Sequence, residues 1–137
     1  MWAIYALLSA FFAALVALFA KIGIKGVDSD LATAIRTAVI LLITWGIVLF
    51  KGNVSGIHAI TRHTWLFLVL SGMATGLSWL FYFKALQIGK IAQVAPVDKL
   101  SVALAILLAF VFLGEQVSAK EIIGAGLVVA GTLVLVL

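Results

Sequence analysis

Five long apolar runs constrain the fold of this chain more than any other feature. Each run is roughly 19 to 23 residues long, which as an α-helix is enough to cross a hydrocarbon core of about 30 Å. Hydrophobic residues make up 66% of the 137 residues and charged residues only 10%, which is more apolar than a soluble domain requires. We therefore predict an all-α, polytopic membrane protein with five transmembrane helices. The predicted spans are residues 2–20, 31–50, 65–86, 91–113 and 119–137, in a single domain over residues 1–137.

The connections between the runs indicate where helices begin. Asp28, Ser29 or Asp30 can cap the second helix, because their side-chain oxygens accept hydrogen bonds from free backbone N–H groups. Ser118 and Glu121 have the spacing of a capping box, which predicts the start of the fifth helix. The first run has no basic segment before it and is too long for the apolar part of a secretory signal, so we interpret it as a membrane span.

The fourth run contains polar residues that a membrane-spanning helix seldom tolerates. Pro96, Asp98, Lys99 and Ser101 all lie within it. A carboxylate and an ammonium group inside a span cost several kcal/mol unless they are paired or hydrated. Pro96 also deprives the Ala92 carbonyl of its helical hydrogen-bond donor. Charge together with an interrupted backbone at membrane depth is typical of a transport pathway, and Pro96 is the predicted hinge.

Four charged residues are predicted to lie at similar depth in one leaflet. Arg36 is roughly 8 Å and Asp98 roughly 10 Å into spans that start from the same side, at 1.5 Å per residue. The third span ends on that side, close to Lys84. The adjacent Asp98 and Lys99 point about 100° apart on a regular helix, so we expect Asp98 to pair with Arg36 or Lys84 instead. Ser101, three residues after Asp98, can add a hydrogen bond to it.

This cluster carries three cations and one anion, and several interpretations follow. The excess positive charge can receive an anionic group of a substrate, such as a carboxylate or a phosphate. Alternatively, Asp98 exchanges a proton or coordinates a cation during a transport cycle. A structural interpretation stays open beside these. In it, Lys84 and Lys99 extend toward the interface and an Arg36–Asp98 pair fixes helix packing.

Polar residues in the connections have simpler interpretations. Glu115 follows the opposite end of the fourth span, where it either pairs locally, for example with Lys120, or acts as a gate. His58 and His63 are five residues apart with no carboxylate nearby, which does not favour a metal site. We find no nucleophile, zinc or phosphate-loop motif, so the sequence predicts neither an enzyme nor a cofactor.

Small residues occur at the spacing that lets membrane helices approach closely. Gly72 and Gly76 have this spacing in the third run, and Gly126 and Ala130 have it in the fifth. Such faces form contacts either within one chain or between two copies. The motif predicts helix packing at these positions without choosing between the two.

Basic residues give little preference for one orientation in the membrane. Five spans place the two ends of the chain on opposite sides. Orientation follows the excess of Lys and Arg in the loops, and three such residues lie on each side. They are Lys51, Arg62 and Lys120 on one side and Lys21, Lys25 and Lys90 on the other. We interpret this balance as dual topology and an antiparallel homodimer, with a single orientation set by a different partner as the alternative. The net charge of +4 is spread over short loops, so no nucleic-acid partner is predicted.

The sequence resembles the EamA domain of the drug/metabolite transporter superfamily over its whole length. The stretches that carry the resemblance are KALQIG at 84–89, Pro96, FLGE at 112–115, IGAG at 123–126 and GT at 131–132, with Arg36 near the start of the second span. The resemblance implies one five-helix repeat of a ten-helix, inverted-repeat transporter. It also implies export or exchange of small metabolites through a central cavity.

From the residues and the resemblance together, we expect a secondary transporter of a small polar metabolite in the inner membrane. It would work by alternating access as an antiparallel homodimer in the bilayer, with coupling to a proton or another cation possible. A flippase for a lipid-linked substrate is one alternative. A small multidrug-type cation exporter is another, although the first span has no carboxylate for such a substrate. A membrane assembly subunit that transports nothing represents a different class.

Overall fold

Five helical segments long enough and apolar enough to cross a membrane make up the computed structural model, which describes residues 1–137. This confirms the predicted all-α, polytopic membrane class. The third segment begins earlier than its apolar run, because polar residues form its first turn. The segments are Trp2–Gly23, Ser29–Lys51, Arg62–Ile88, Ile91–Leu113 and Ala119–Val136.

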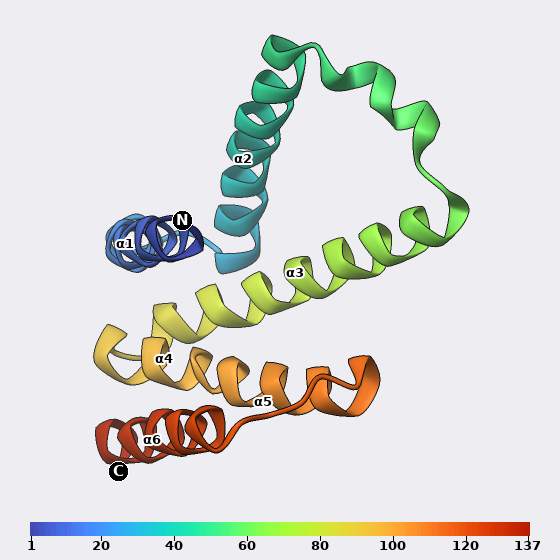
Figure 1. Cartoon of the computed structure of the whole chain (residues 1–137). Helices are drawn as coiled ribbons and strands as arrows, with labels where there is room; N and C mark the ends of the chain where they lie inside the picture. The colour runs from blue at the N-terminus through green and yellow to red at the C-terminus, as the bar shows by residue number, and fades with distance from the viewer. The chain divides into compact units, whose positions relative to one another are not determined.

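The fourth segment is divided into three helical pieces, whereas the other four are continuous α-helices (Figure 1). The continuous helices are α1 (Trp2–Gly23), α2 (Ser29–Lys51), α3 (Arg62–Ile88) and α6 (Ala119–Val136). The divided segment consists of α4 (Ile91–Asp98), α5 (Leu100–Leu108) and a π-helical turn, η2 (Ala109–Leu113). A 3-10 helix, η1 (Asn53–Ala59), lies in the connection between α2 and α3.

The chain forms two compact units. Residues 20–87 make up the central unit, with the end of α1, all of α2 and nearly all of α3. Residues 1–19 and 88–137 make up the terminal unit, with most of α1 and the helices from α4 onward. Each unit holds some of the residues that the sequence marks as candidates.

In the central unit, α2 has well-defined ends. Asp28 is its N-cap, and the Oδ2 atom of Asp28 accepts hydrogen bonds from the backbone N–H groups of Asp30 (3.1 Å) and Leu31 (3.0 Å). The helix stops at Gly52, whose φ of 70° lies in the left-handed region that favours glycine. The cap is therefore the first of the three residues that the sequence offered.

The end of α1 and the end of α3 are joined by polar contacts in the central unit. Lys21 Nζ donates a hydrogen bond to the Leu86 carbonyl. Gln87 Nε2 donates to the carbonyls of Ile24 (3.3 Å) and Val27 (2.7 Å). Carbonyls in the last turn of a helix lack intrahelical donors, and a cation there also interacts favourably with the helix dipole. These bonds hold the first connection against the end of α3.

In the terminal unit, α4 and α5 pack along α6 (Figure 1). The start of α6 is the capping box that the sequence predicts. Ser118 Oγ accepts a hydrogen bond from the Glu121 N–H (3.3 Å), and the Glu121 carboxylate accepts one from the Ser118 N–H (2.7 Å). This cap satisfies two backbone donors that the end of the helix would otherwise leave free.

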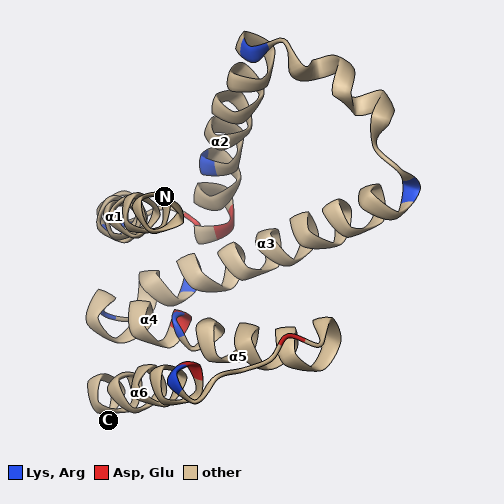
Figure 2. Ribbon diagram, in the orientation of Figure 1, with Lys and Arg blue, Asp and Glu red and all other residues tan.

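Most large apolar side chains are exposed, and only five apolar residues are buried: Ala17, Ala20, Ile24, Phe83 and Leu86. Figure 2 shows charged segments mainly near helix ends and connections, with long uncharged stretches between them. A water-soluble protein does not expose so much contiguous apolar surface. Lipid chains are the natural cover for such helices, as the five apolar runs predicted.

Candidate functional site

The backbone of the fourth span is interrupted where the sequence places its charges. Pro96 lies inside α4, and Lys99 separates α4 from α5. The Lys99 N–H bonds to the carbonyls of both Ala95 (3.3 Å) and Pro96 (3.0 Å), which is a tighter turn than a regular α-helix makes. A polar break inside an apolar span is tolerated where it is buried in protein or lines a hydrated cavity.

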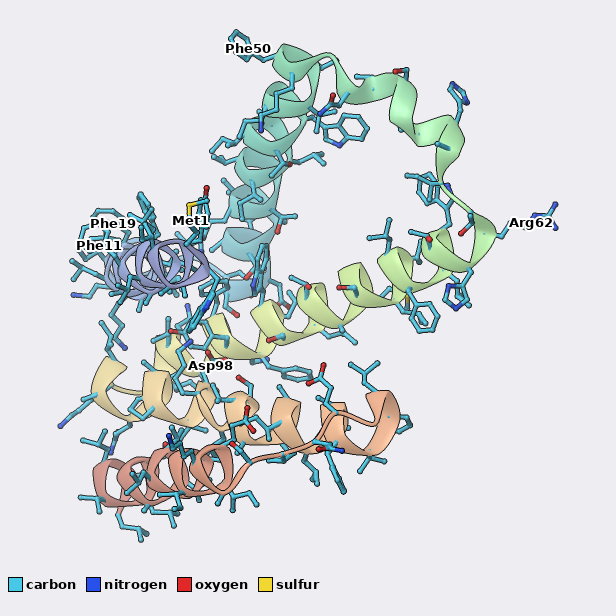
Figure 3. All side chains as sticks on the ribbon, viewed as in Figure 1. Met1, Phe11, Phe19, Phe50, Arg62 and Asp98 are labelled. Atoms are coloured by element: carbon cyan, nitrogen blue, oxygen red, sulfur yellow. The ribbon has the colours of Figure 1, made fainter.

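Asp98 and Lys99 form an ion pair with each other, at 3.2 Å between Lys99 Nζ and Asp98 Oδ2. The expectation that these neighbours are poorly placed to pair was wrong. It assumed a regular helix, whereas the helix ends at Asp98, and the long Lys99 side chain reaches back to the carboxylate. The Asp98 side chain is 34% exposed and that of Lys99 58%, so the pair remains accessible at the break, where Figure 3 labels Asp98.

Thr132 on α6 contacts the break and was not identified as a site residue from the sequence. Its hydroxyl donates to the Pro96 carbonyl (3.1 Å) and to the Val128 carbonyl of its own helix (2.8 Å), and the residue is only 4% exposed. Ser101, which was expected to bond Asp98, is instead exposed at the start of α5. The only sequence signal for Thr132 is a lone hydroxyl within an apolar run.

Arg36 on α2 stacks on an aromatic ring of α3. Its Cζ atom lies 3.6 Å from the centroid of the Phe83 ring, and Phe83 is 3% exposed. The Nη1 atom of Arg36 is buried and has no hydrogen-bond partner. A guanidinium over an aromatic face is a favourable cation–π arrangement. The sequence identified Arg36, but not the ring that holds it.

Lys84 follows Phe83 on α3 and is exposed. Arg36 and Lys84 belong to the central unit, whereas Asp98 and Lys99 belong to the terminal unit. Arg36 is held against its own unit by Phe83, and Asp98 by its sequence neighbour. The four-residue cluster across both units therefore stays a prediction.

Glu115 directly follows Gly114, where the helical segment η2 ends. Gly114 has a φ of 65°, and the Glu115 N–H donates to the Ala109 carbonyl (3.3 Å) across η2. Glu115 forms no ion pair with Lys120, contrary to the local pairing considered above. Its role as a gate remains a prediction.

The glycines of the small-residue faces leave space for an added side-chain atom. A Cβ atom added at Gly72, Gly76 or Gly126 would meet no atom outside its own stretch of helix within 4 Å, and Ala130 is exposed. Helix packing at these positions, either within one chain or between two copies, stays a prediction.

These features define a multi-pass membrane protein in which one span is broken and charged. The profile of the EamA-like transporter family matches residues 1–137, and the chain belongs to this family. It is 48% identical over 134 residues to a protein of Sinorhizobium sp. named "Uncharacterized transporter in cobO 3'region", covering 98% of this chain and 95% of that protein. No solved structure matches the chain. Family and relative together point to a membrane transporter rather than an enzyme.

Proposed function

We propose that this protein is a secondary transporter that exports or exchanges a small polar metabolite across the inner membrane. Two antiparallel copies form the working unit and expose the substrate site to each side in turn. Each copy contributes one five-helix repeat, and the broken fourth span lines the pathway with the accessible Asp98–Lys99 pair.

The observation that carries this proposal is the interruption at Lys99. The segment Ile91–Leu113 is otherwise strongly apolar, yet it contains an internal proline, a tight turn and two charged side chains. Charges inside a span are expensive and are retained where substrates or ions pass. Broken helices also give transporters flexible joints and polar backbone groups near the substrate.

Two observations support an antiparallel pair. The relative has nearly the same length as this chain, since the alignment covers 95% of it, so the one-repeat length is common to both. Loop charges favour neither orientation, as the three-to-three count of basic residues shows. Two copies in opposite orientations then rebuild the ten helices of a two-repeat transporter.

The alternative from a different class, a non-transporting assembly subunit, predicts that the charge cluster is fully paired and that there is no central cavity. The Nη1 atom of Arg36 has no hydrogen-bond partner. A buried donor without an acceptor destabilises the fold, so this nitrogen supports the transporter more than a subunit with a fully paired cluster.

The test combines orientation with transport. Reporters active only in the cytoplasm or only in the periplasm are fused after Leu137, and comparable signals from both are expected. Inside-out and right-side-out vesicles from the same cells are then incubated with a cell metabolite extract, and protein-dependent uptake is measured by mass spectrometry. Signal from one reporter alone would replace the homodimer with a pair of different chains. Absence of any protein-dependent flux would remove the transporter.

A further inference from the structure

Arg36 contacts the Phe83 ring, but part of its guanidinium has no hydrogen-bond partner. The flat face of the group lies on the Phe83 ring, with Cζ 3.6 Å from the ring centroid. Guanidinium N–H donors lie in the plane of the group, so stacking does not occupy them. The Nη1 donors are buried and have no acceptor. The structure thus presents an oriented cation whose edge still lacks a hydrogen-bond partner.

The charge of the central unit points to the sign of the missing partner. Residues 20–87 contain six basic residues and two acidic ones, whereas the terminal unit contains three of each. The whole net charge of +4 therefore resides in the central unit. Of the two carboxylates there, that of Asp28 is already used to cap α2. The acidic residues of this unit do not balance its cations.

The depth of Arg36 makes this imbalance significant. Arg36 is seven residues after Ser29, the first residue of α2, which corresponds to roughly 10 Å along the helix. Bulk water does not hydrate a group at that depth freely, and a guanidinium retains its charge there. Arg36 at this depth therefore needs both a hydrogen-bond acceptor and a counter-charge. An anionic group with oxygen atoms supplies both.

We infer that Arg36, stacked on Phe83, binds a carboxylate or phosphate group through its Nη1 edge. This inference rests on the proposed transport function and names the class of its substrate as an anionic one. The anion belongs either to a transported solute or to a lipid headgroup, since both supply the same oxygens. Phe83 is the positioning residue that orients the guanidinium.

The test measures binding, independently of transport. The full-length protein is placed in phosphatidylcholine nanodiscs, and its unfolding temperature is followed by the fluorescence of its four tryptophans. The probes are inorganic phosphate and succinate, with chloride at the same ionic strength as reference. A second series replaces part of the phosphatidylcholine with phosphatidylglycerol. A ligand that binds only the folded state raises the unfolding temperature in a saturable manner.

We expect a saturable rise of a few degrees for the wild type. Arg36→Gln is expected to lose the rise. Arg36→Lys is expected to retain a smaller one, because an ammonium lacks the bidentate geometry. Phe83→Leu is expected to weaken the apparent affinity severalfold. Arg62→Gln is the matched control, because it removes the same charge from the same unit at an exposed position, where Figure 3 shows the side chain at the start of α3.

A rise with phosphate or succinate in phosphatidylcholine assigns the site to a solute. A rise only with phosphatidylglycerol assigns it to a lipid headgroup. If the wild type shows no saturable rise, or if Arg36→Gln and Phe83→Leu bind as the wild type does, the inference is overturned. If Arg36→Gln does not fold, Arg36→Lys and Phe83→Leu decide the question. Flux and orientation are measured in separate experiments. A negative binding result would therefore not contradict the transporter proposal, and absence of flux would not contradict a positive binding result.

Discussion

At the residue scale, the Asp98–Lys99 pair combines a carboxylate with a cation at the break between α4 and α5. A pair that is 34% and 58% exposed is open to exchange with substrate or solvent groups. Because an exposed ion pair contributes only about 0–1 kcal/mol, a substrate group can replace either partner at little cost.

Replacement of the carboxylate should separate transport from folding. Asp98→Asn leaves Lys99 without its partner, so we expect normal amounts of protein in the membrane and a loss of flux of about tenfold or more, as a loss of about 1.4 kcal/mol implies. Vesicle uptake measured against protein content checks this. Asp30→Asn, at an exposed carboxylate in the first turn of α2, is the control and should transport normally. Unchanged flux in Asp98→Asn would limit the pair to a structural role.

The same residues show what sequence reasoning reaches at this scale. Asp98, Lys99 and Arg36 were identifiable because charges inside apolar runs are conspicuous. The partners that these side chains contact, Lys99 for Asp98 and Phe83 for Arg36, were not identifiable. The ideal helical angle of about 100° between neighbours fails where a helix ends, and no local pattern indicates that Phe83 lies beneath Arg36.

At the element scale, the broken span is supported by α6. Thr132 donates to the Pro96 carbonyl, which also accepts from the Lys99 N–H. This contact links the two helices at the turn itself. It was not predictable from either helix alone, because it depends on how α4 packs against α6.

Removal of the Thr132 hydroxyl should loosen this link. Thr132→Val keeps the shape of the side chain and removes the donor, so we expect the protein to lose about 1 kcal/mol of stability and to unfold a few degrees lower. Thr75→Val is the control, because the Thr75 hydroxyl bonds only to the Ser71 carbonyl of its own helix. Thermal unfolding in nanodiscs compares the two. Equal shifts would show that the contact with Pro96 contributes nothing specific.

The five spans themselves were predictable, since apolar runs about 20 residues long leave few alternatives in a membrane. The capping box at Ser118 and Glu121 was also predictable, because both partners are local. The division of the fourth span was indicated by Pro96 and its charges. The position of the break at Lys99 depends on the backbone and was not indicated.

At the scale of the whole molecule, the small-residue face at Gly72 and Gly76 on α3 is a candidate contact with a second copy in the proposed homodimer. A Cβ atom added at Gly72 or Gly76 would meet no atom outside its own stretch of helix within 4 Å, and small residues permit close approach of helices in membranes. Gly76 is also near the middle of α3 (Arg62–Ile88). The middle of a helix faces its own equivalent when two copies cross in antiparallel orientation.

A cross-link can test this face directly, because the chain contains no cysteine. Gly76→Cys is expected to form disulfide-linked dimers in native membranes under mild oxidation. Ala74→Cys, two residues away and roughly 200° around the helix, is expected to remain largely monomeric. Yields are read from non-reducing gels. Equal yields at both positions would indicate random collision, and absence of dimer at Gly76→Cys would move the contact to another helix.

The Asp98–Lys99 ion pair also affects how the fourth span can move. Both of its partners are consecutive residues of one backbone, so it does not tie the fourth span to any other helix. In the proposed alternating-access cycle, a rocking movement of that span would carry both charges together without breaking an ion pair between helices. An ion pair between two helices would have to break in each transport cycle. The Asp98–Lys99 pair can stay intact, because both residues move with the same span.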